Sequence, residues 1–220
     1  MNGAMARVTI LLADDHTVLR HGLRRILEAD PDLQVIAEAG DGRTAVALAE
    51  QHRPTVVLMD IGMPLLNGIE ATREITRIDP RIAVLILSMH AEGGYLRRSI
   101  DAGARGYLLK DADDLDVVRA VKALAQGGSF FSPAVAAQMR EQLLNRNTGD
   151  GTDEVAVLTP RERQVLQLVA EGKSNKEIAV LMDLGVSTVD THRKHVMEKL
   201  NLHNTAELVR FAIRQRIVVD

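Results

Sequence analysis

Residues 1–126 alternate short apolar runs with segments in which apolar residues recur every three or four positions. The runs have the length of strands and are almost continuously apolar, which is typical of strands buried on both faces of a parallel sheet. They are Val8–Ala13, Gln34–Ala39, Val56–Asp60, Ala83–Ser88 and Gly106–Leu109. Five strands alternating with five helices predict an α/β domain over residues 7–126, with a doubly wound parallel sheet of five strands.

The pattern changes after this domain. Gly127-Gly128-Ser129 ends the last helix, and Ser132–Asn145 can form one more, with Ser132 as its cap and Pro133 at its first position. Asn145–Glu154 is polar, contains two glycines and has no large apolar residue. Residues 127–154 are therefore predicted to be a linker that can contain one helix.

Residues 155–220 predict a smaller all-α domain of four helices, near 160–171, 175–182, 188–200 and 205–214. Each predicted start has Ser, Thr or Asn three residues before an acid, which lets both side chains cap the first helical turn. The four pairs are Thr159/Glu162, Ser174/Glu177, Ser187/Asp190 and Asn204/Glu207. Gly172 and Gly185 lie where the chain must turn, and the second and third helices form a helix-turn-helix.

Composition excludes several classes of protein. The chain is 46% hydrophobic and 26% charged, as in ordinary globular proteins, and it has no cysteine for disulfides or thiolate metal sites. No apolar run approaches the roughly 20 residues that span a bilayer, and the first residues, MNGAMAR, lack the apolar core of a signal peptide. We therefore expect a cytoplasmic protein that does not contact membranes.

Charge alone is weak evidence for nucleic-acid binding. The net charge is −3, and residues 155–220 carry only 10 Lys and Arg against 8 Asp and Glu. Aromatic residues make up 2% of the chain, which disfavours base stacking with single strands. A DNA-binding function must therefore be argued from motifs.

Acidic residues follow the predicted strands where a parallel sheet binds its ligands. Asp14 and Asp15 follow the first strand, Asp60 ends the third, Ser88 ends the fourth and Lys110 follows the fifth. Three carboxylates at one edge repel each other and need a cation. With no Cys or His expected nearby, the best match is Mg²⁺, a hard ion held by oxygens.

A metal-bound aspartate beside a lysine and a hydroxyl suits phosphoryl transfer. The carboxylate attacks in line, the metal and the ammonium neutralise the phosphoryl oxygens, and an aspartyl phosphate forms. A phosphatase of the haloacid-dehalogenase type would need Asp-x-Asp on the first strand, whereas here the two acids are adjacent and the acceptor lies on the third. We reject that alternative.

Asp14-Asp15, the MDIGMP stretch around Asp60, Ser88 and Lys110 resemble the receiver domain of bacterial two-component response regulators, over residues 7–126. The resemblance implies a flavodoxin-like and CheY-like fold in which Asp60 is the phosphoacceptor. Asp14 and Asp15 would hold Mg²⁺ together with Asp60. Lys110 would bind the phosphoryl group, and Ser88 would move toward it.

Two further receiver features are implied by the same resemblance. Tyr107 corresponds to the aromatic residue that turns inward when Ser88 moves, and Asn67-Gly68 matches the turn after the active-site loop. From the sequence alone, Tyr107 could also be packed core, and Ser88 could be a simple turn residue. Many receivers have proline after the lysine, whereas this chain has Asp111, so the cis-proline geometry of relatives is not assured.

The helix-turn-helix predicts a surface for DNA. Val189, Val196 and Leu200 recur on one face of its second helix and would pack with Ile178, Leu181 and Leu184. The opposite face and the helix starts are left for bases and phosphates. The predicted DNA-binding residues are Asn175, Lys176, Thr188, Asp190, Thr191, Arg193, Lys194 and Lys199.

The stretches LTPRERQVLQLVAEGKSNKEIA, STVDTHRKHVMEKL and NTAEL resemble the LuxR-type helix-turn-helix of the NarL/FixJ class, over about residues 155–215. The resemblance implies a dimer formed through the last helix and base contacts by Asp190, Thr191 and Lys194. Asp190 stands where relatives often have lysine; it could accept from cytosine or only cap its own helix. Lys194 could contact a base or a phosphate, and His192 is expected to pack inside.

Together these patterns predict a two-component response regulator. A sensor histidine kinase would phosphorylate Asp60, which would control homodimerisation and binding to double-stranded promoter DNA, with RNA polymerase as a further candidate partner. A dimer that neutralises about six phosphates should lose affinity with salt at a slope near −5. The alternatives are a DNA binder that is never phosphorylated and an interaction protein that titrates phosphoryl groups. Enzymatic activity would be limited to its own phosphorylation and dephosphorylation.

Overall fold

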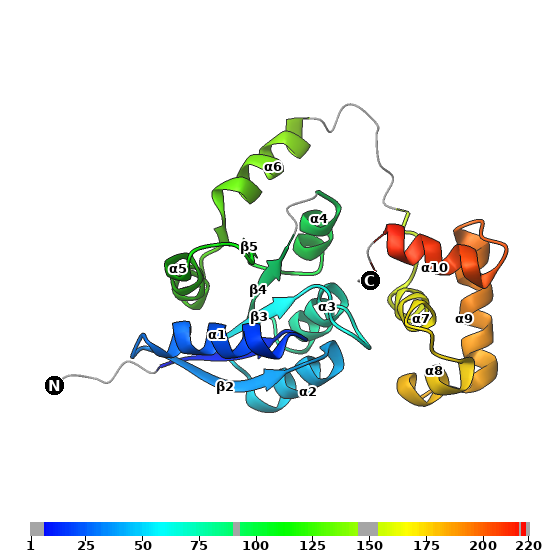
Figure 1. Cartoon of the computed structure of the whole chain (residues 1–220), viewed down its shortest axis with the longest axis horizontal. Helices are drawn as coiled ribbons and strands as arrows, with labels where there is room; N and C mark the ends of the chain where they lie inside the picture. The colour runs from blue at the N-terminus through cyan, green and yellow to red at the C-terminus, as the bar shows by residue number, and fades with distance from the viewer. Residues whose placement is uncertain (1–6, 90–92, 145–153, 216, 219–220) are drawn as a thin grey trace. The chain divides into compact units, whose positions relative to one another are not determined.

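The computed structural model describes residues 7–89, 93–144, 154–215 and 217–218, which form an N-terminal α/β unit and a C-terminal helical unit (Figure 1). Among the helices of these residues, none is both long enough and apolar enough to cross a membrane.

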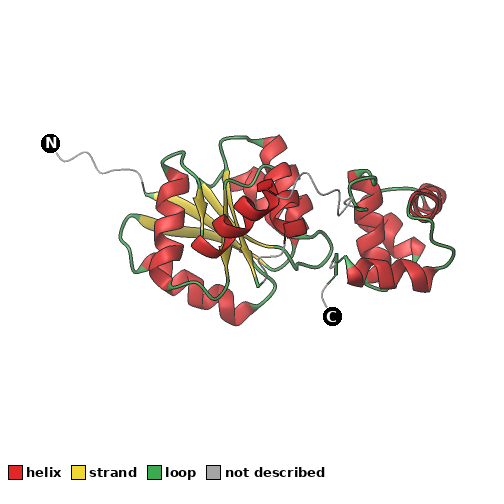
Figure 2. Ribbon diagram, turned by 90° about the horizontal axis from the view of Figure 1, so that it is seen from above, coloured by secondary structure: helices red, strands yellow, loops and turns green. Residues whose placement is uncertain are grey.

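The α/β unit contains a parallel sheet in the order β2-β1-β3-β4-β5-β6. The strands are β1 (Val8–Ala13), β2 (Leu33–Ala39), β3 (Val56–Asp60), β4 (Ala83–Ser88), β5 (Gly106–Leu109) and β6 (Phe130–Phe131). The predicted doubly wound parallel sheet is confirmed, because the strand order reverses direction at β1 and helices cover both faces (Figure 2). The predicted number of five strands is wrong, since β6 adds a sixth.

β6 escaped prediction because it is only two residues long, too short to show any hydrophobic period. Phe130 and Phe131 pair with Gly106 and Tyr107 of β5. The added helix after it is confirmed as α6 (Pro133–Leu144), which packs against α4 (Gly93–Asp101); Asn145 lies outside the described residues. The Ser132 carbonyl accepts from Ala136 N, but the Ser132 hydroxyl has no hydrogen bond within the described residues, so its predicted side-chain cap is not formed.

Five helices alternate with the first five strands and connect them. They are α1 (Thr17–Glu28), α2 (Gly42–His52), α3 (Gly68–Ile78), α4 and α5 (Asp114–Ala125). On one face, α1 and α5 lie side by side and contribute Leu23, Leu27, Val121 and Leu124 to a core with alternate strand residues. On the other face, α2 packs against α3. Burial from both sides explains why β3 and β4 are apolar at almost every position.

The C-terminal unit consists of α7 (Pro160–Ala170), α8 (Asn175–Met182), α9 (Val186–Lys199) and α10 (Thr205–Arg214), which confirms the predicted four-helix domain. The predicted inward face is also confirmed. Ile178, Val189 and Val196 are fully buried, and Leu181, Leu184 and Leu200 pack against the same core.

Three of the four predicted helix caps are formed. Thr159 with Glu162 and Ser174 with Glu177 make complete capping boxes, and the Asn204 side chain accepts from Glu207 N. The fourth prediction, Ser187 with Asp190, is wrong. α9 begins one residue before Ser187, and its N-cap is Gly185, which has no side chain to cap with.

The turn between α8 and α9 explains this error. Asp183 adopts the left-handed conformation (φ 53°) that ends α8, and Leu184 N donates to Ala179 O. The chain therefore re-enters helical geometry two residues earlier than a Ser187 cap would require. The left-handed residue of this turn is Asp183, whereas Gly172 (φ 79°) does have the positive φ expected where α7 ends.

Candidate functional site

The parallel register brings the ends of three strands together at the carboxyl edge of the sheet. Ala13 of β1 pairs with Met59 of β3, so the residues that follow, Asp14 and Asp60, lie at the same level. Asp14 is 1% exposed and Asp60 is 5% exposed. Burial of two carboxylates side by side is costly unless a cation balances them.

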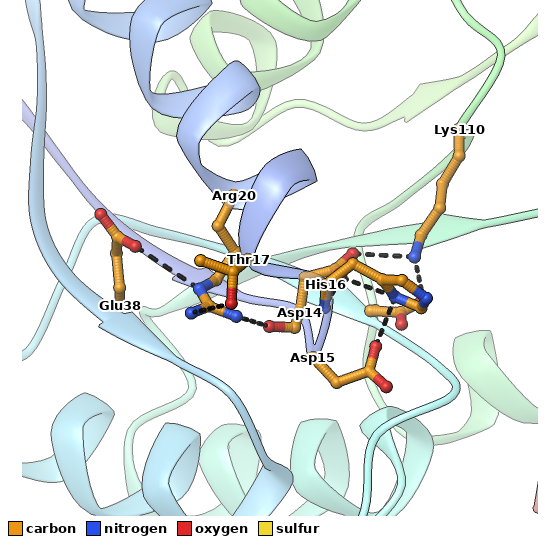
Figure 3. Close-up of polar contacts among 8 residues, drawn as sticks. Asp14, Asp15, His16, Thr17, Arg20, Glu38 and Lys110 are labelled. Carbon is orange, nitrogen blue, oxygen red and sulfur yellow. Dashed lines mark hydrogen bonds and ion pairs between the residues drawn. The ribbon is translucent and has the colours of Figure 1, made fainter.

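Lys110 is that cation. Its Nζ lies 2.7 Å from Asp14 Oδ2 (Figure 3). The same nitrogen lies 2.9 Å from Asp60 Oδ1, and the lysine side chain is 8% exposed. Lys110 follows β5, and its backbone N donates to Ser88 O at the end of β4. This backbone hydrogen bond therefore fixes the position of the Lys110 backbone, from which the side chain extends toward the carboxylates.

The titration of this group of charges reflects burial and mutual repulsion. Burial raises the pKa of the Asp60 carboxyl; the Lys110 ammonium opposes this rise and the Asp14 carboxylate adds to it. Burial favours the neutral amine of Lys110, but the charges of Asp60 and Asp14 outweigh burial and raise the pKa of Lys110. The surroundings therefore favour the charged form of Lys110 and disfavour the charged form of Asp60.

The donor atoms at this edge fit a divalent metal ion. Ligand atoms of Asp14, Asp15, His16 and Asp60 all lie within 4.8 Å of one another. Three carboxylates against one ammonium leave two negative charges, which a divalent cation would neutralise. Carboxylate oxygens are the ligands that Mg²⁺ prefers, so Asp14, Asp15 and Asp60 fit the predicted magnesium site.

The expectation that no histidine lies near the acidic residues is wrong, because His16 follows Asp15 as the N-cap of α1 and lies beside both acids. Its backbone N donates to Asp14 Oδ1 (2.7 Å), and its Nδ1 lies 2.6 Å from Asp15 Oδ1 (Figure 3). The only available signal was its position next to two predicted metal ligands.

A second unpredicted group holds the loop after β1. Arg20 of α1 donates through Nη1 to Asp14 O (2.6 Å), and its Nε lies 3.4 Å from Glu38 Oε2 of β2 (Figure 3). Glu38 also accepts from Arg24 Nη1 at 2.8 Å. Arg20 thus ties the backbone of the acidic loop to the neighbouring strand. No spacing rule identifies Arg20 in advance, because its partners come from two other elements.

Gly68 shows why the predicted turn after Asp60 needs glycine. A Cβ at this position would lie 1.8 Å from the carbonyl oxygen of Asp60, far inside van der Waals contact. The backbone N of Gly68 also donates to Ile61 O, which closes the turn at the start of α3. The close approach of the two backbones leaves no room for a side chain beside Asp60.

The predicted switch residues lie close to this edge. Ser88 ends β4 and is 4% exposed, and Tyr107 of β5 pairs in register with Ile86 and is 1% exposed. Tyr107 is therefore part of the packed interior in this conformation. Asp111 is exposed, and all peptide bonds of the described residues are trans, so the lysine is followed by ordinary backbone here.

The predicted DNA-binding residues divide into two groups. Asp190 and Lys199 are exposed, as are Lys176, Thr188, Thr191 and Lys194, but among the described residues the last four make no hydrogen bond or ion pair with another helix. Lys194 has an ion pair with Glu198 (3.7 Å), and the Thr191 hydroxyl donates to Ser187 O within α9. These four side chains are available at the surface of the helical unit.

The other predicted residues are engaged in contacts between helices. Asn175, at the start of α8, donates through Nδ2 to Asp190 Oδ1 and accepts through Oδ1 from Arg193. Arg193 also donates to Thr205 Oγ1 of α10 at 2.9 Å. Asp190 therefore bonds to α8, and the interpretation that it caps its own helix is wrong.

Lys199 and His192 complete the predicted set. Lys199 Nζ lies 2.8 Å from Glu162 Oε2 of α7, where Glu162 is buried. Burial raises the pKa of Glu162, but Lys199 and Thr159 outweigh it, so the pKa lies below its usual range. His192 is half-buried.

Comparisons with known proteins identify both units. The model of the response regulator receiver domain matches residues 10–122, and the model of the bacterial regulatory proteins of the luxR family matches residues 156–212. The transcriptional regulatory protein DegU of Brevibacillus brevis is 35% identical over 216 residues, with 92% of each chain covered. The transcriptional regulatory protein MctR of Rhizobium johnstonii is 38% identical over 212 residues, with 96% of each chain covered.

A solved structure is similar over nearly the whole chain. RcsB from Salmonella enterica serovar Typhimurium, bound to promoter rprA in the presence of the phosphomimetic BeF3−, matches with a TM-score of 0.61 and 26% identity. The match covers 93% of this chain and 98% of RcsB.

Proposed function

The chain belongs to the two-component response regulators that join a receiver domain to a LuxR-type DNA-binding domain, and we propose that it couples phosphorylation of Asp60 to binding of promoter DNA. The observation that carries the proposal is the position of the Lys110 ammonium between Asp14 and Asp60. One ammonium group does not balance the negative charge of the neighbouring carboxylates. The site can therefore take up a metal ion, as a site that accepts a phosphoryl group requires.

The reaction at Asp60 is a phosphoryl transfer from a sensor histidine kinase. An Asp60 carboxylate oxygen attacks the phosphorus of the phosphohistidine; the P–N bond breaks and the imidazole leaves with the electron pair. Asp14, Asp15 and Asp60 would hold Mg²⁺, which when bound would neutralise charge on the phosphoryl oxygens. Lys110 neutralises another oxygen and thereby stabilises the aspartyl phosphate.

Ser88 and Tyr107 then transmit the conformational change from the phosphorylated site. The Ser88 hydroxyl moves to the phosphoryl group, and Tyr107 repacks in response, which changes the surface around β4 and β5. Shifting a state that is one-tenth populated to nine-tenths takes about 2.6 kcal/mol, which an added charge in contact with Lys110 can supply.

The helical unit reads DNA with α9 in the major groove. Thr188, Thr191 and Lys194 are the side chains proposed to approach the bases, and Lys176 a phosphate, because their side chains are exposed. The hydrogen bonds that join Asn175 to Asp190 and Arg193 would hold these side chains in place when they contact DNA. Lys199 would contact DNA while its ammonium group is paired with Glu162. RcsB, which is similar to this chain, is bound to promoter rprA in its solved structure, and this supports DNA binding by this chain.

The remaining partners are proposals of the same kind. A homodimer formed on phosphorylation would place two copies of α9 on two half-sites, and RNA polymerase would be the recipient of the regulatory effect. Chemistry catalysed by the chain would be confined to formation and hydrolysis of its own aspartyl phosphate. A cytoplasmic location stays a prediction.

Phosphodonor labelling tests the proposal. Incubation of the full chain with acetyl phosphate and Mg²⁺ should give a singly phosphorylated protein, seen by intact-mass spectrometry and retarded on a phosphate-affinity gel. Asp60→Asn, which keeps the shape of the side chain, should abolish the modification, whereas Asp111→Asn, at an exposed position beside Lys110, should not. Undiminished labelling of Asp60→Asn would show that another residue is the acceptor.

A wild-type protein that is never labelled but binds promoter fragments would contradict the proposal in a different way. It would leave the chain as a DNA-binding regulator that does not use phosphorylation.

A further inference from the structure

The surface of α9 that the proposed function assigns to DNA contains an acid without a cationic partner. Asp190 is exposed, and within the described residues it forms no ion pair. The two lysines of the same helix, Lys194 and Lys199, pair instead with Glu198 and Glu162. A carboxylate that faces DNA repels the phosphates, so it weakens binding unless a base donates a hydrogen bond to it.

Hydrogen bonds that join three helices hold Asp190 in place. Asn175, the first residue of α8, donates through Nδ2 to Asp190 Oδ1 and accepts through Oδ1 from Arg193 Nη1. Because arginine only donates and a carboxylate only accepts, these two partners leave a single orientation for the amide. Arg193 is held in turn by its bond to Thr205 Oγ1 of α10 at 2.9 Å.

The acceptor capacity of the Asp190 carboxylate is only partly used. Asn175 occupies Oδ1, and within the described residues no hydrogen bond reaches Oδ2. An ionised carboxylate has about four acceptor sites on its two oxygens. Asp190 therefore presents an acceptor at a fixed position on the outer face of α9.

From this arrangement we infer that Asp190 determines specificity by accepting a hydrogen bond from the N4 amino group of a cytosine in the major groove. The inference rests on the proposed function, because it requires α9 to bind DNA, and it names a base of the operator. Asn175 is then a positioning residue, since it acts on the base through Asp190.

The position of Asp190 fits a base contact. In a helix-turn-helix, the residues in the N-terminal part of the second helix approach the base edges, and Asp190 lies in the first half of α9. Lys194 follows four residues later, so the two side chains share one face of the helix, and both line the same groove of the helical unit. A direct contact of Asp190 with a phosphate is excluded, because both groups are negatively charged.

The chemistry of the base edges selects cytosine. In the major groove, guanine presents the acceptors O6 and N7, and thymine presents the acceptor O4, so both repel a carboxylate. Adenine presents the donor N6 beside the acceptor N7, and this second atom also repels a carboxylate. Cytosine presents the donor N4 without an acceptor of its own on the same edge, so it is the base that an aspartate matches.

The consequence is that Asp190 contributes to specificity more than to affinity. Opposite guanine, adenine or thymine, its carboxylate loses water without gaining a complete set of hydrogen bonds, which penalises the wrong sequence. Opposite cytosine, the amino group compensates for that loss. Removal of the charge should therefore strengthen binding to non-specific duplex DNA and weaken the discrimination between bases.

Selection from a library of random DNA duplexes tests the inference. The full chain, incubated with acetyl phosphate and Mg²⁺, binds the library, and sequencing of the bound fraction gives the relative affinity for each base at each position. The wild-type chain should prefer cytosine at one position by about tenfold, or about 1.4 kcal/mol. Asp190→Asn, which keeps the size of the side chain, should prefer adenine there, because an amide can bond to both N6 and N7.

Two further variants separate base recognition from charge and from folding. Asp183→Asn removes an equal charge just before α9, at a left-handed position that asparagine tolerates, so it should leave the selected bases unchanged. Asn175→Ala keeps the carboxylate but removes its support, and it should lower the cytosine preference about threefold. If Asn175 stabilised only the fold, its loss would weaken binding to all sequences equally.

The outcomes distinguish the inference from the proposed function. The same selected bases for the wild-type chain and Asp190→Asn would overturn the inference while leaving the proposed function intact. A wild-type preference for adenine at the position that Asp190→Asn changes would also overturn it. A wild-type chain that selects no sequence would instead contradict the proposed function, and the inference with it.

Discussion

The acidic edge of the receiver and the exposed face of α9 present two different kinds of site. At the acidic edge, Asp14, Asp60 and Lys110 are nearly buried, and each position follows from the parallel register of the strands. On α9, the positions of the side chains follow from helical spacing, but the partners of Asp190, Arg193 and Lys199 come from α8, α10 and α7.

This contrast has an energetic meaning. Buried charges are strongly coupled to folding because water does not screen them, so the receiver site should be sensitive to any loss of charge balance. Exposed side chains such as Lys194 contribute little to stability, since water and salt already solvate them. Mutations at the acidic edge should therefore affect stability and activity together, whereas mutations on α9 should affect DNA binding alone.

Gly68→Ala should give the sharpest loss of stability. The added Cβ would lie 1.8 Å from Asp60 O, so the backbone beside the acceptor must move, at a cost of more than about 3 kcal/mol. Urea unfolding followed by circular dichroism should show the receiver transition at lower denaturant. The matched control is Gly22→Ala in α1, where a Cβ meets nothing within 4 Å and helix propensity should raise stability by up to about 1 kcal/mol. Equal stability of both variants would refute the steric account.

Lys110→Ala tests the charge balance at the same edge. Removal of the ammonium leaves Asp14 and Asp60 without their cation, which should cost about 2–3 kcal/mol in metal-free buffer. Millimolar Mg²⁺ should restore part of that loss, because a divalent ion replaces the missing charge. Lys122→Ala, which removes an exposed ion pair with Asp30, should cost little, and Mg²⁺ should not change its difference from wild type, because its acidic edge is intact. If Mg²⁺ left the difference between Lys110→Ala and wild type unchanged, the metal ion would not compensate for the lost ammonium at the acidic edge.

Lys194→Ala tests the exposed surface of α9, the second of the two sites compared above. It should weaken binding to a promoter fragment selected by the wild-type protein about tenfold, or about 1.4 kcal/mol, without changing the unfolding curve. Fluorescence anisotropy at fixed salt measures the affinity, and Lys122→Ala controls for the change in net charge. Unaltered affinity would remove Lys194 from the DNA-binding surface.

Glu162→Gln removes the buried carboxylate of α7 that pairs with Lys199 of α9. It should have the mildest effect, a decrease of about 1 kcal/mol in the free energy of unfolding at pH 7. Glutamine can still cap α7, but it cannot form the ion pair with Lys199. Because the pKa of Glu162 is lowered in the folded state, its stabilisation is present above the usual glutamate pKa and is lost as pH falls through the folded value.

The difference between wild type and Glu162→Gln should therefore shrink as the unfolding experiment moves from pH 7 to below about pH 4. Glu177→Gln, an exposed capping acid of α8, should show a smaller difference at every pH. A gap that stayed constant with pH would mean that the carboxylate charge of Glu162 does not stabilise the fold.

Sequence periodicity captured the elements that are long enough to repeat. The five longer strands, α6 and the four C-terminal helices were predicted, because strand and helix periods extend over several residues in each. β6, at two residues, is too short to show a period. The predicted start of α9 was wrong because the turn before it depends on the left-handed conformation of Asp183, which its residue type did not reveal.

The approach of Asp14, Asp60 and Lys110 also followed from the sequence, since parallel strands carry their carboxyl ends to one edge. The tertiary structure alone revealed His16 beside Asp15, Arg20 on the Asp14 carbonyl and Asp190 bonded to Asn175. The physical reason is the distance along the chain between the residues that interact. Strand order and helical period are properties of the backbone and recur along the chain, whereas a side-chain hydrogen bond depends on ångström-level placement of two elements that the local sequence does not fix.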